Sequence, residues 1–409
     1  MPYQFPKNFW WGTATASHQV EGGNVYNDTW LMEHNPGTVF VESSGDAVDH
    51  YHRYAEDIAL LAELGFNMYR FSLEWSRIEP EEGEFSLSEI EHYRRMLAAC
   101  HEHGIIPMVT YHHFSSPRWL MRYGGWSGAK TPELFARFCE RAARHLGDLT
   151  GAACTLNEIN IATLISVMSM FRPAHAEQPP AWMAAAARAL DVSPQQFVPF
   201  MFATGPKSIE TVQSAHRRGV EALKSGPASY PVGVTLALME IQAGPGGEET
   251  AARVRYDVNE SYLEAARGDD FVGVQTYSRF RFGPQGMLPP EMEVTQMGYE
   301  FYPEALEATI RQAARVAGVP VIVTENGVAG DDDSRRVEFI QRAVKCVAKC
   351  LKDGIDVRGY TYWSAFDNFE WMQGYKMKFG LIAVDRQTQV RTVKPSARWL
   401  GALARSGIF

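Results

Sequence analysis

The stretches AACTLNE (residues 152–158) and VPVIVTENG (residues 319–327) are short apolar runs, and a glutamate stands where each run ends, Glu158 and Glu325. Such runs are typical of strands in a parallel sheet that is buried on both faces. In an eight-stranded β/α barrel, the C-terminal ends of the strands share one face. The pair therefore predicts two carboxyl groups at that face, whereas a single such glutamate is explained equally well as a polar strand end beside solvent.

Runs of similar composition recur along the chain and alternate with amphipathic stretches. The candidate strands span residues 9–16, 67–73, 105–111, 152–157, 231–237, 271–277, 319–325 and 358–365. The candidate helices between them include residues 51–65, 88–104, 132–147 and 333–354. Apolar residues in these helices recur at three- and four-residue spacing, and several helices end at glycine. This alternation predicts an α/β fold, a single-domain (β/α)8 TIM barrel over residues 1–409.

Three segments are expected to elaborate the barrel. The Pro- and Ala-rich residues 172–191 and the Gly-rich residues 242–249 predict loops after the fourth and fifth strands. Residues 368–395, after the eighth strand, predict a long loop and a short hairpin before a last helix. Loops that follow barrel strands lie at the C-terminal face, so the first two are expected to shape the entrance to any site there.

The composition excludes some classes of partner. A formal net charge of −9 disfavours nucleic acid and anionic membranes as partners, and 45% hydrophobic with 21% charged residues is ordinary for a globular enzyme. No apolar run approaches the roughly 20 residues that a membrane-spanning helix needs. The N-terminal residues lack a signal-peptide pattern, and the five cysteines form no C-x-x-C pair. These features predict a location in the reducing cytoplasm.

Further polar and aromatic side chains are expected at the same face as the two glutamates. They are Gln19 after the first strand, Arg70 in the second, His112 after the third, Asn157 beside Glu158, Tyr277 at the end of the sixth and Trp363 near the end of the eighth. Sugar recognition needs such a mixture of hydrogen-bonding groups and an aromatic face. Each residue also has a structural explanation, because an arginine is often an ion-pair partner and an aromatic residue or histidine is often part of the core.

Longer motifs resemble the family 1 glycoside hydrolases, β-glucosidases and their relatives. The resemblance runs nearly end to end and rests on FWWGTATASHQVEG (9–22), DHYHRYAEDIALLAELGFNMYRFSLEWSRIEP (49–80), TYHHF (110–114), GGW (124–126), TLNE (155–158), TENG (324–327), YWSAFDNFEW (362–371) and KFGLIAVD (378–385). The order of TLNE, TENG and NFEW is specific, whereas each motif alone is weak.

The resemblance implies a retaining β-glycosidase that removes terminal non-reducing β-D-glucosyl residues, with fucosyl and galactosyl residues as side substrates, through a covalent glycosyl-enzyme intermediate. It implies that Glu158 is the acid/base and Glu325 the nucleophile, and that Arg70 and Tyr277 support the nucleophile. The residues implied to bind the sugar are Gln19, His112, Asn157, Tyr277, Trp363, Glu370 and Trp371. It implies no metal and no cofactor, and a small-molecule β-glycoside as the only partner; the oligomeric state stays open.

Electrostatics supports these roles. Arg70 beside Glu325 is expected to lower the pKa of the nucleophile, and the charge of Glu325 is expected to raise the pKa of Glu158 so that it starts protonated. A retaining mechanism predicts carboxyl groups about 5–5.5 Å apart, whereas inversion needs roughly 6.5–9.5 Å.

The chain departs from the family pattern at several positions. Ile159 stands where a proline usually follows the acid/base, and Gln275 with Thr276 replaces a more usual Asn-Tyr. His113 and Phe114 replace a commoner Trp-Asp, and His113 is interpreted as an interior histidine. These changes leave the natural aglycone and the ranking of sugars open.

Residues 168–171 contain Met168, Met170 and Phe171, which follow the catalytic strand. They are interpreted either as an apolar wall for the aglycone or, equally well, as the packing of a helix start.

Three other functions were weighed. A metallohydrolase would use H-x-H pairs, but His50 with His52 and His101 with His103 are not at the C-terminal ends of strands. A carbohydrate-binding protein without catalysis would lack one of the glutamates. A 6-phosphoglycosidase would need cations around the phosphate, whereas Glu370 places a carboxylate there, and Lys376 and Lys378 are interpreted as solvated loop charges.

Overall fold

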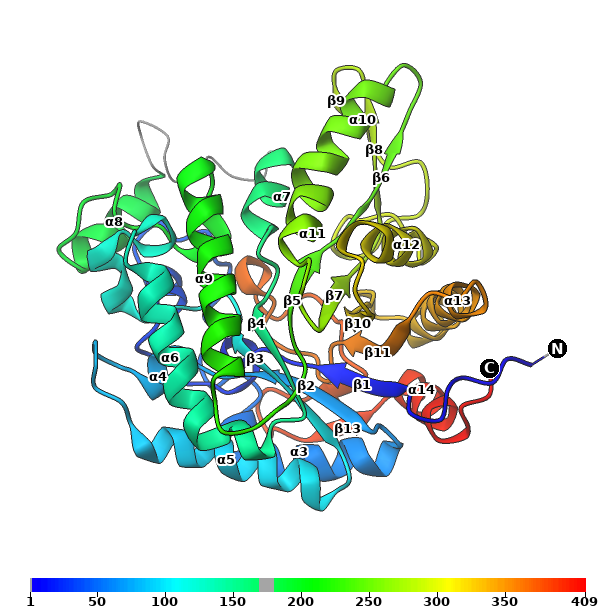
Figure 1. Ribbon diagram of the computed structural model, residues 1–409, viewed down its shortest axis with the longest axis horizontal. Coiled ribbons are helices and arrows are strands. Elements are labelled where there is room, and N and C mark those ends of the chain that lie inside the picture. The colour runs from blue at the N-terminus through cyan, green and yellow to red at the C-terminus, as the bar shows by residue number, and fades with distance from the viewer. Residues whose placement is uncertain (1, 169–179) are drawn as a thin grey trace.

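The computed structural model describes residues 2–168 and 180–409, and its centre is a closed barrel of eight parallel strands (Figure 1). In spatial order the strands are β1 (Trp10–Ala14), β2 (Met68–Ser72), β3 (Ile106–His112), β4 (Ala152–Leu156), β5 (Val232–Ala237), β7 (Phe271–Gln275), β10 (Val321–Glu325) and β11 (Val357–Trp363). β11 pairs in parallel with β1 and closes the barrel. The predicted TIM barrel is confirmed, and each predicted strand overlaps an observed one.

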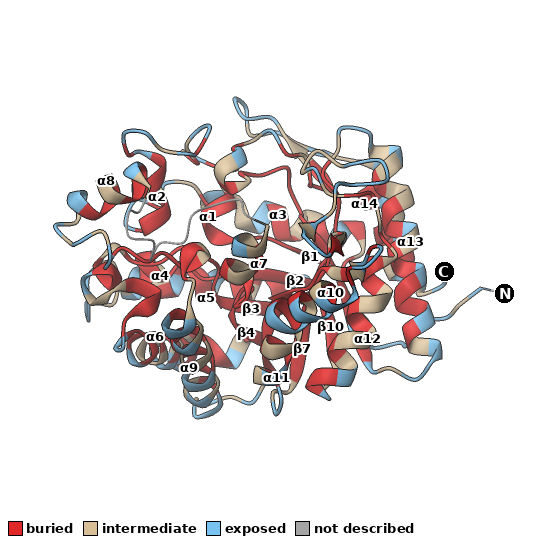
Figure 2. Cartoon of the chain, turned by 90° about the horizontal axis from the view of Figure 1, so that it is seen from above, coloured by how far each residue is buried: buried red, intermediate tan, exposed pale blue. Residues whose placement is uncertain are grey.

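Helices surround the barrel and pack on one another in sequence. They are α3 (His50–Leu64), α5 (Leu87–Glu102), α6 (Thr131–Leu146), α9 (Pro206–Lys224), α11 (Ser261–Ala265), α12 (Ala305–Ala317), α13 (Asp333–Lys352) and α14 (Pro395–Ser406). Each presents an apolar stripe inward; α6, for example, buries Phe135, Phe138 and Ala142 at three- and four-residue spacing. Figure 2 shows the buried sides of these helices turned toward the strands and the exposed sides turned outward.

Shorter elements lie in the connections. The helices are α1 (Ser17–Val20), α2 (Asp28–Glu33), α4 (Trp75–Ile78), α7 (Ile161–Val167), α8 (Ala181–Ala189) and α10 (Glu248–Arg255). The 3-10 turns are η1 (Arg118–Tyr123), η2 (Gly125–Ser127), η3 (Gly147–Leu149), η4 (Phe200–Phe202) and η6 (Trp371–Gln373), and η5 (Tyr256–Glu260) is a π-helical turn. Two small sheets complete the chain, β6 (Glu240–Ala243) with β8 (Arg279–Gly283) and β9 (Gly286–Met287), and the hairpin β12 (Ile382–Val384) with β13 (Arg391–Val393).

Two loop predictions are partly wrong. Residues 181–189, within the predicted loop 172–191, form helix α8, because an alanine-rich segment has high helix propensity and α8 buries Trp182 and Met183 on one side. Residues 172–179 lie outside the described residues. In the second predicted loop, β6 ends at Ala243 and α10 begins at Glu248, which leaves only residues 244–247 irregular. The predicted hairpin and last helix after the eighth strand are confirmed by β12, β13 and α14.

The barrel interior has an apolar floor beneath its polar C-terminal end. Met68, Met108, Cys154 and Ile322 belong to one buried cluster. Arg70 follows Met68 by two residues, so both side chains lie on the same face of β2. The floor therefore separates the polar groups described below from solvent at the other end of the barrel. Among residues 2–168 and 180–409, no helix is both long enough and apolar enough to cross a bilayer.

Candidate active site

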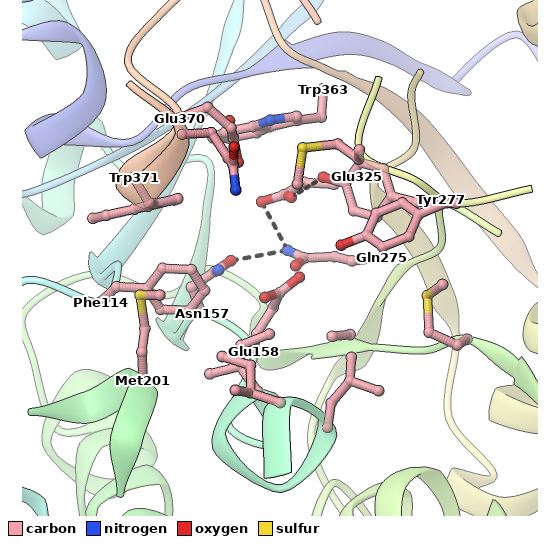
Figure 3. A pocket seen from close by; sticks show the side chains of 18 of the residues that line it. Phe114, Asn157, Glu158, Met201, Gln275, Tyr277, Glu325, Trp363, Glu370 and Trp371 are labelled. Carbon is pink, nitrogen blue, oxygen red and sulfur yellow. Dashed lines mark hydrogen bonds between the residues drawn. The ribbon is translucent and has the colours of Figure 1, made fainter. Parts of the chain in front are cut away.

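A pocket of about 1010 Å³, including open space at its mouth, lies at the C-terminal ends of the barrel strands (Figure 3). The polar region of its lining contains His113, Asn157, Glu158, Gln275, Tyr277, Glu325, Trp363, Glu370 and Trp371. They follow or end β3, β4, β7, β10 and β11, or belong to the loop after β11. The structure thus brings Glu158 and Glu325 into one cavity, although they are 167 residues apart in the sequence.

Glu325 is held by three donors. The Arg70 guanidinium (Nη1) donates to Oε1 at 2.5 Å, the Tyr277 hydroxyl donates to Oε2 at 2.5 Å, and the Gln275 amide donates to Oε1 at 3.1 Å. Arg70 and Glu325 are both buried. These contacts fix the orientation of the carboxylate and favour its charged form.

The prediction of a lowered pKa for Glu325 is wrong for the sum of all influences, because the pKa of this carboxyl is raised. Burial raises the pKa of this carboxyl, and burial is the largest influence on it. The charge and hydrogen bond of Arg70 and the hydrogen bond of Tyr277 lower the pKa, as expected, but do not offset the loss of solvation. The prediction considered the cation and not the depth at which the barrel buries the pair.

Glu158 has a different environment. Within the described residues, no side chain donates a hydrogen bond to its carboxyl group, while its backbone N–H donates to Oγ1 of Thr235 at 3.1 Å. Burial, followed by the charge of Glu325, raises the pKa of Glu158 well above its ordinary value, and Arg70 opposes this. The predicted rise in the pKa of Glu158 is confirmed, and the charge of Glu325 is one of its causes, as expected.

The backbone after β4 turns sharply at Glu158, whose φ of 46° lies in the left-handed region that few residues other than glycine adopt. Ile159 follows, in the position where a proline is usual, and its N–H donates to the carbonyl oxygen of Thr235 at 3.4 Å. Proline has no N–H and cannot make this bond. The departure at Ile159 thus ties the loop after Glu158 to β5.

Asn157 is held in a single amide orientation. Its Oδ1 accepts from Nη2 of Arg70 at 2.6 Å, from Nε2 of Gln275 at 2.9 Å and from Oγ1 of Thr235 at 3.1 Å. Its Nδ2 is buried and has no hydrogen-bond partner among the described residues. The same is true of Oε1 of Gln275. Buried donors and acceptors of this kind are normally satisfied, so both atoms are available to the hydroxyl groups of a ligand.

The two neighbouring histidines lie differently, although each has a buried Nδ1 without a hydrogen-bond partner among the described residues. His112 does not line the pocket: its ring packs at 4.7 Å from Trp126 and at 4.8 Å from Phe200, and its Nε2 bonds to Ser116. His113 lines the pocket and stacks at 5.7 Å on Trp363. β3 ends at His112, so strand alternation no longer decides where the next side chains point.

His113 is neutral, since burial and then the charge of Arg70 hold its pKa well below the ordinary value. Its Nδ1 is buried without a partner among the described residues. Neutral imidazole can donate from one nitrogen and accept at the other. His113 therefore joins His112 as a candidate for the hydroxyl-binding role that the sequence predicted for His112.

Glu370 and its neighbours form the opposite wall of the polar region. The amide of Gln19 donates to Oε2 of Glu370 at 3.2 Å and to the carbonyl oxygen of Phe369 at 2.6 Å. Burial and the charge of Glu325 raise the pKa of Glu370 to about 8. Trp371 stacks on His18 with ring centroids 5.9 Å apart. The predicted residues Gln19, Glu370 and Trp371 thus come together, although Gln19 lies behind Glu370 and does not itself line the pocket.

Trp363 and the motif that contains Glu325 approach closely. A Cβ on Gly327 would lie 2.0 Å from the carbonyl oxygen of Trp363, so only glycine fits there. The backbone N–H of Trp363 donates to the carbonyl oxygen of Asn326 at 3.0 Å. These contacts fix the backbone of Trp363 relative to the segment that carries Glu325.

The histidines of the two H-x-H pairs lie away from the pocket, and none of them lines it. His50 bonds to Asp57 and His52 to Asp49, and His101 bonds to the carbonyl oxygen of Leu149. Each of these three rings thus has a partner near its own helix, in line with a structural role.

Sequence reasoning missed some of the lining. Gln275 was noted as a departure but not as a site residue, and its place at the end of a barrel strand was the signal that could have identified it. Met201, Met239 and Met297 also line the pocket, from η4 and from connections that carry no local signal. Met168 lines it as predicted, whereas Met170 and Phe171 lie outside the described residues.

Many known proteins are similar to this chain in sequence or in structure. The model of a family described as glycosyl hydrolase family 1 matches residues 1–239 and 274–408. A β-glucosidase from Agrobacterium sp. is 31% identical over 461 residues, which cover 98% of this chain and 95% of that protein. The solved structure of β-glycosidase BGL167 is similar with a TM-score of 0.96 at 58% identity, over 98% of this chain and 97% of the other. A β-glucosidase from Thermotoga maritima in complex with glucoimidazole has a TM-score of 0.84 at 26% identity, over 99% of each chain.

Proposed function

This chain belongs to glycosyl hydrolase family 1 and is a β-glucosidase, a hydrolase of β-glucosides, and from that membership we propose how its pocket acts. We propose that it removes terminal non-reducing β-D-glucosyl residues with retention of configuration, through a covalent intermediate on Glu325. β-Fucosyl and β-galactosyl residues are proposed as side substrates, and residues 1–409 as one catalytic domain.

One observation carries this proposal, the unequal environment of two carboxyl groups in one pocket. Glu325 accepts hydrogen bonds from Arg70 and Tyr277, whereas Glu158 has no side-chain donor among the described residues and has a pKa raised well above its ordinary value. A nucleophile has to be ionised and a general acid has to hold a proton. These two environments favour Glu325 as the nucleophile and Glu158 as the general acid.

In the first step, a carboxylate oxygen of Glu325 attacks the anomeric carbon while Glu158 gives its proton to the glycosidic oxygen. The bond from the anomeric carbon to that oxygen breaks, the aglycone leaves as a neutral alcohol, and the sugar stays bonded to Glu325 as an ester. Charge then disappears from Glu325, which removes one cause of the raised pKa of Glu158. Glu158 thereby becomes a base for the second step.

In the second step, Glu158 takes a proton from water and the oxygen of that water attacks the anomeric carbon. The ester bond breaks, Glu325 regains its charge, and Glu158 regains its proton. Two inversions at the same carbon give net retention. The separation of about 5–5.5 Å between the carboxyl groups remains a prediction of this mechanism.

The sugar is proposed to lie between Asn157, His113 and the pair of Gln19 and Glu370, with Trp363 beneath its ring. Unpartnered buried atoms of Asn157 and His113 supply a donor and a second polar group, and Gln19 orients the carboxyl of Glu370. Trp371 is proposed as a further hydroxyl contact.

Unphosphorylated sugars suit this site better than 6-phosphorylated ones. Among the described residues that line the pocket, the charged side chains are carboxylates, with neither lysine nor arginine. Lys376 is exposed, as expected for a solvated loop charge. A dianionic phosphate in this poorly solvated site would find no cation among the described lining side chains to pair with, and it would meet the charge of Glu325.

The mechanism is tested by following hydrolysis of 4-nitrophenyl β-D-glucoside by NMR during the first turnovers. β-Glucose as the first sugar product supports retention, and α-glucose as the first product refutes it. The same assay with the β-fucoside and β-galactoside ranks the side substrates.

We propose a cytoplasmic location for the enzyme. All five cysteines are buried free thiols. Burial raises the pKa of the Cys100 thiol to about 12, so this thiol is unreactive, as in proteins that need no disulfides.

A further inference from the structure

The pocket has two halves of different chemistry. The half around Glu325 is polar, as described above. In the other half, one face of helix α7 lines the cavity with Ile161, Leu164, Ile165 and Met168. These positions are spaced i, i+3, i+4 and i+7, which places them on one stripe of a helix. We call this stripe, together with the methionines named next, the apolar half.

Four more methionines complete the apolar half. Met239 follows β5 and packs in one buried cluster with Leu164, whereas Met297 packs against the cluster that contains Trp363. Met201 of η4 and Met372 of η6 pack against a third cluster. The apolar half is therefore assembled from the connections after β4, β5, β7 and β11, whose residues pack against more than one core cluster.

The apolar half adjoins Glu158. Helix α7 begins three residues after this glutamate, and Asn160 between them donates to the carbonyl oxygen of Ala237 at 2.7 Å and accepts from the N–H of Ala237 at 2.9 Å. Figure 3 shows Glu158 above the end of this helix, pointing toward the centre of the pocket. If Glu158 protonates the glycosidic oxygen, the departing group lies against the α7 stripe.

We propose that the apolar half is the aglycone site and that it selects glucosides of bulky apolar alcohols, such as alkyl, aryl or fused-ring alcohols, over glucosides of sugars. This inference rests on the proposed function of Glu158 and Glu325. A sugar in the aglycone position presents several hydroxyl groups that need partners when they leave water. Among the described residues outside the polar half, the lining offers only Tyr299 and Gln373 as hydrogen-bonding side chains.

Methionine suits a site that takes apolar groups of different shapes. Its side chain is unbranched and polarisable, so it adapts to an irregular surface and also contacts aromatic rings favourably. Five of the 16 methionines of the chain line this one pocket.

The test compares n-octyl β-D-glucoside with cellobiose, two glucosides that differ only in the aglycone. Octanol is a poorer leaving group than a sugar hydroxyl, so a preference for the octyl glucoside has to come from binding of the aglycone. We expect kcat/KM to be at least about tenfold higher for the octyl glucoside. An equal or higher kcat/KM for cellobiose would overturn the inference.

Variants locate the preference. Met168→Gln and Met239→Gln keep the length of the side chain and add an amide, and each should lower the octyl-to-cellobiose ratio of kcat/KM about fivefold or more. Met287→Gln is the matched control, because Met287 is 46% exposed and does not line the pocket. Its ratio should equal that of the unmodified enzyme.

A third substrate keeps the interpretation unambiguous. Hydrolysis of 2,4-dinitrophenyl β-D-glucoside needs little acid assistance, and its rate in the variants shows that the fold and the polar half are intact. If no β-glucoside is hydrolysed by the unmodified enzyme, the proposed function fails. If both variants hydrolyse the dinitrophenyl glucoside normally and keep the octyl-to-cellobiose ratio of kcat/KM, only the aglycone inference fails. Met168 is partly exposed, so the fold tolerates its substitution even if it does not tolerate substitution of the buried Met239.

Discussion

Nε2 of Gln275 lies 2.9 Å from Oδ1 of Asn157, and the same nitrogen lies 3.1 Å from Oε1 of Glu325. One side-chain amide therefore joins an asparagine at the end of β4 to the glutamate at the end of β10. Gln275 is buried, so nothing from solvent replaces these bonds if they are lost.

Replacement of Gln275 by glutamate should shift the pH dependence. A carboxylate against Glu325 raises the pKa of that nucleophile, so the acid limb of the profile of kcat/KM should move to higher pH, with activity at neutral pH reduced about tenfold or more. Gln275→Asn is the control, because it shortens the side chain without adding charge and should lower activity with no shift of the limb. A profile unmoved in Gln275→Glu would show that Gln275 does not act on Glu325.

Glu325→Gln should abolish turnover of 4-nitrophenyl β-D-glucoside, by about 10⁴-fold or more, since no covalent intermediate can form without the carboxylate. The fold should persist, because Gln retains the shape of the side chain, its Oε1 can still accept from Arg70, and its Nε2 can donate to the Tyr277 hydroxyl. Circular dichroism and a thermal melt check the fold. Near-normal turnover in a folded Glu325→Gln variant would show that Glu325 is not the nucleophile.

Glu158→Ala should slow the second step, because no base remains for water, and azide should restore turnover of activated substrates. Azide needs no base and enters the space left by the carboxyl group. The expected product is β-glucosyl azide, identified by NMR. The α-azide would contradict attack on an intermediate held by Glu325.

The different positions of His112 and His113 relative to the pocket lead to a paired test. His113→Ala should lower kcat/KM for the β-glucoside by about tenfold or more, because a buried hydrogen bond to the sugar is lost. His112→Phe should leave kcat/KM within about twofold, since His112 packs among Trp126 and Phe200 and phenylalanine continues that packing. A large loss of kcat/KM in His112→Phe with little loss in His113→Ala would instead support His112 as the histidine that binds the sugar.

Glu370 should make the protein less stable as the pH rises. Its pKa in the folded protein is about 8, above the ordinary 4.5, so the folded state holds the proton more tightly than the unfolded state does. Stability is therefore lost progressively as the pH rises from about 4.5 to about 8. Glu370→Gln removes this loss, and its Tm advantage over the unmodified enzyme should grow by about 2 °C or more between pH 5 and pH 8. A constant Tm difference would contradict the raised pKa.

The barrel was predictable because each strand is a short apolar run between helices of clear periodicity. The small sheet of β6, β8 and β9 was not, since its strands are partly exposed and β6 pairs with a strand some forty residues later. Helix α8 was not predicted, because the Pro- and Ala-rich composition of residues 172–191 was interpreted as a loop. Alanine, unlike proline, favours helix.

The meeting of Glu158 and Glu325 in one pocket was predictable from strand ends and motifs, but the surroundings of these glutamates were not. Whether His112 or His113 enters the pocket depends on the turn after β3, which includes Phe114 at a φ of 71°, and no local pattern specifies that turn. The net pKa of Glu325 depends on burial by side chains from several strands. The methionine lining depends on loops that meet only in three dimensions.

Helix α7 begins only three residues beyond Glu158 and is anchored to β5 through Asn160. Mutations that reshape the α7 stripe for a new leaving group consequently risk displacing the proton donor. Met297, carried by a connection that holds neither glutamate, provides a route by which laboratory evolution can broaden substrate range without loss of turnover.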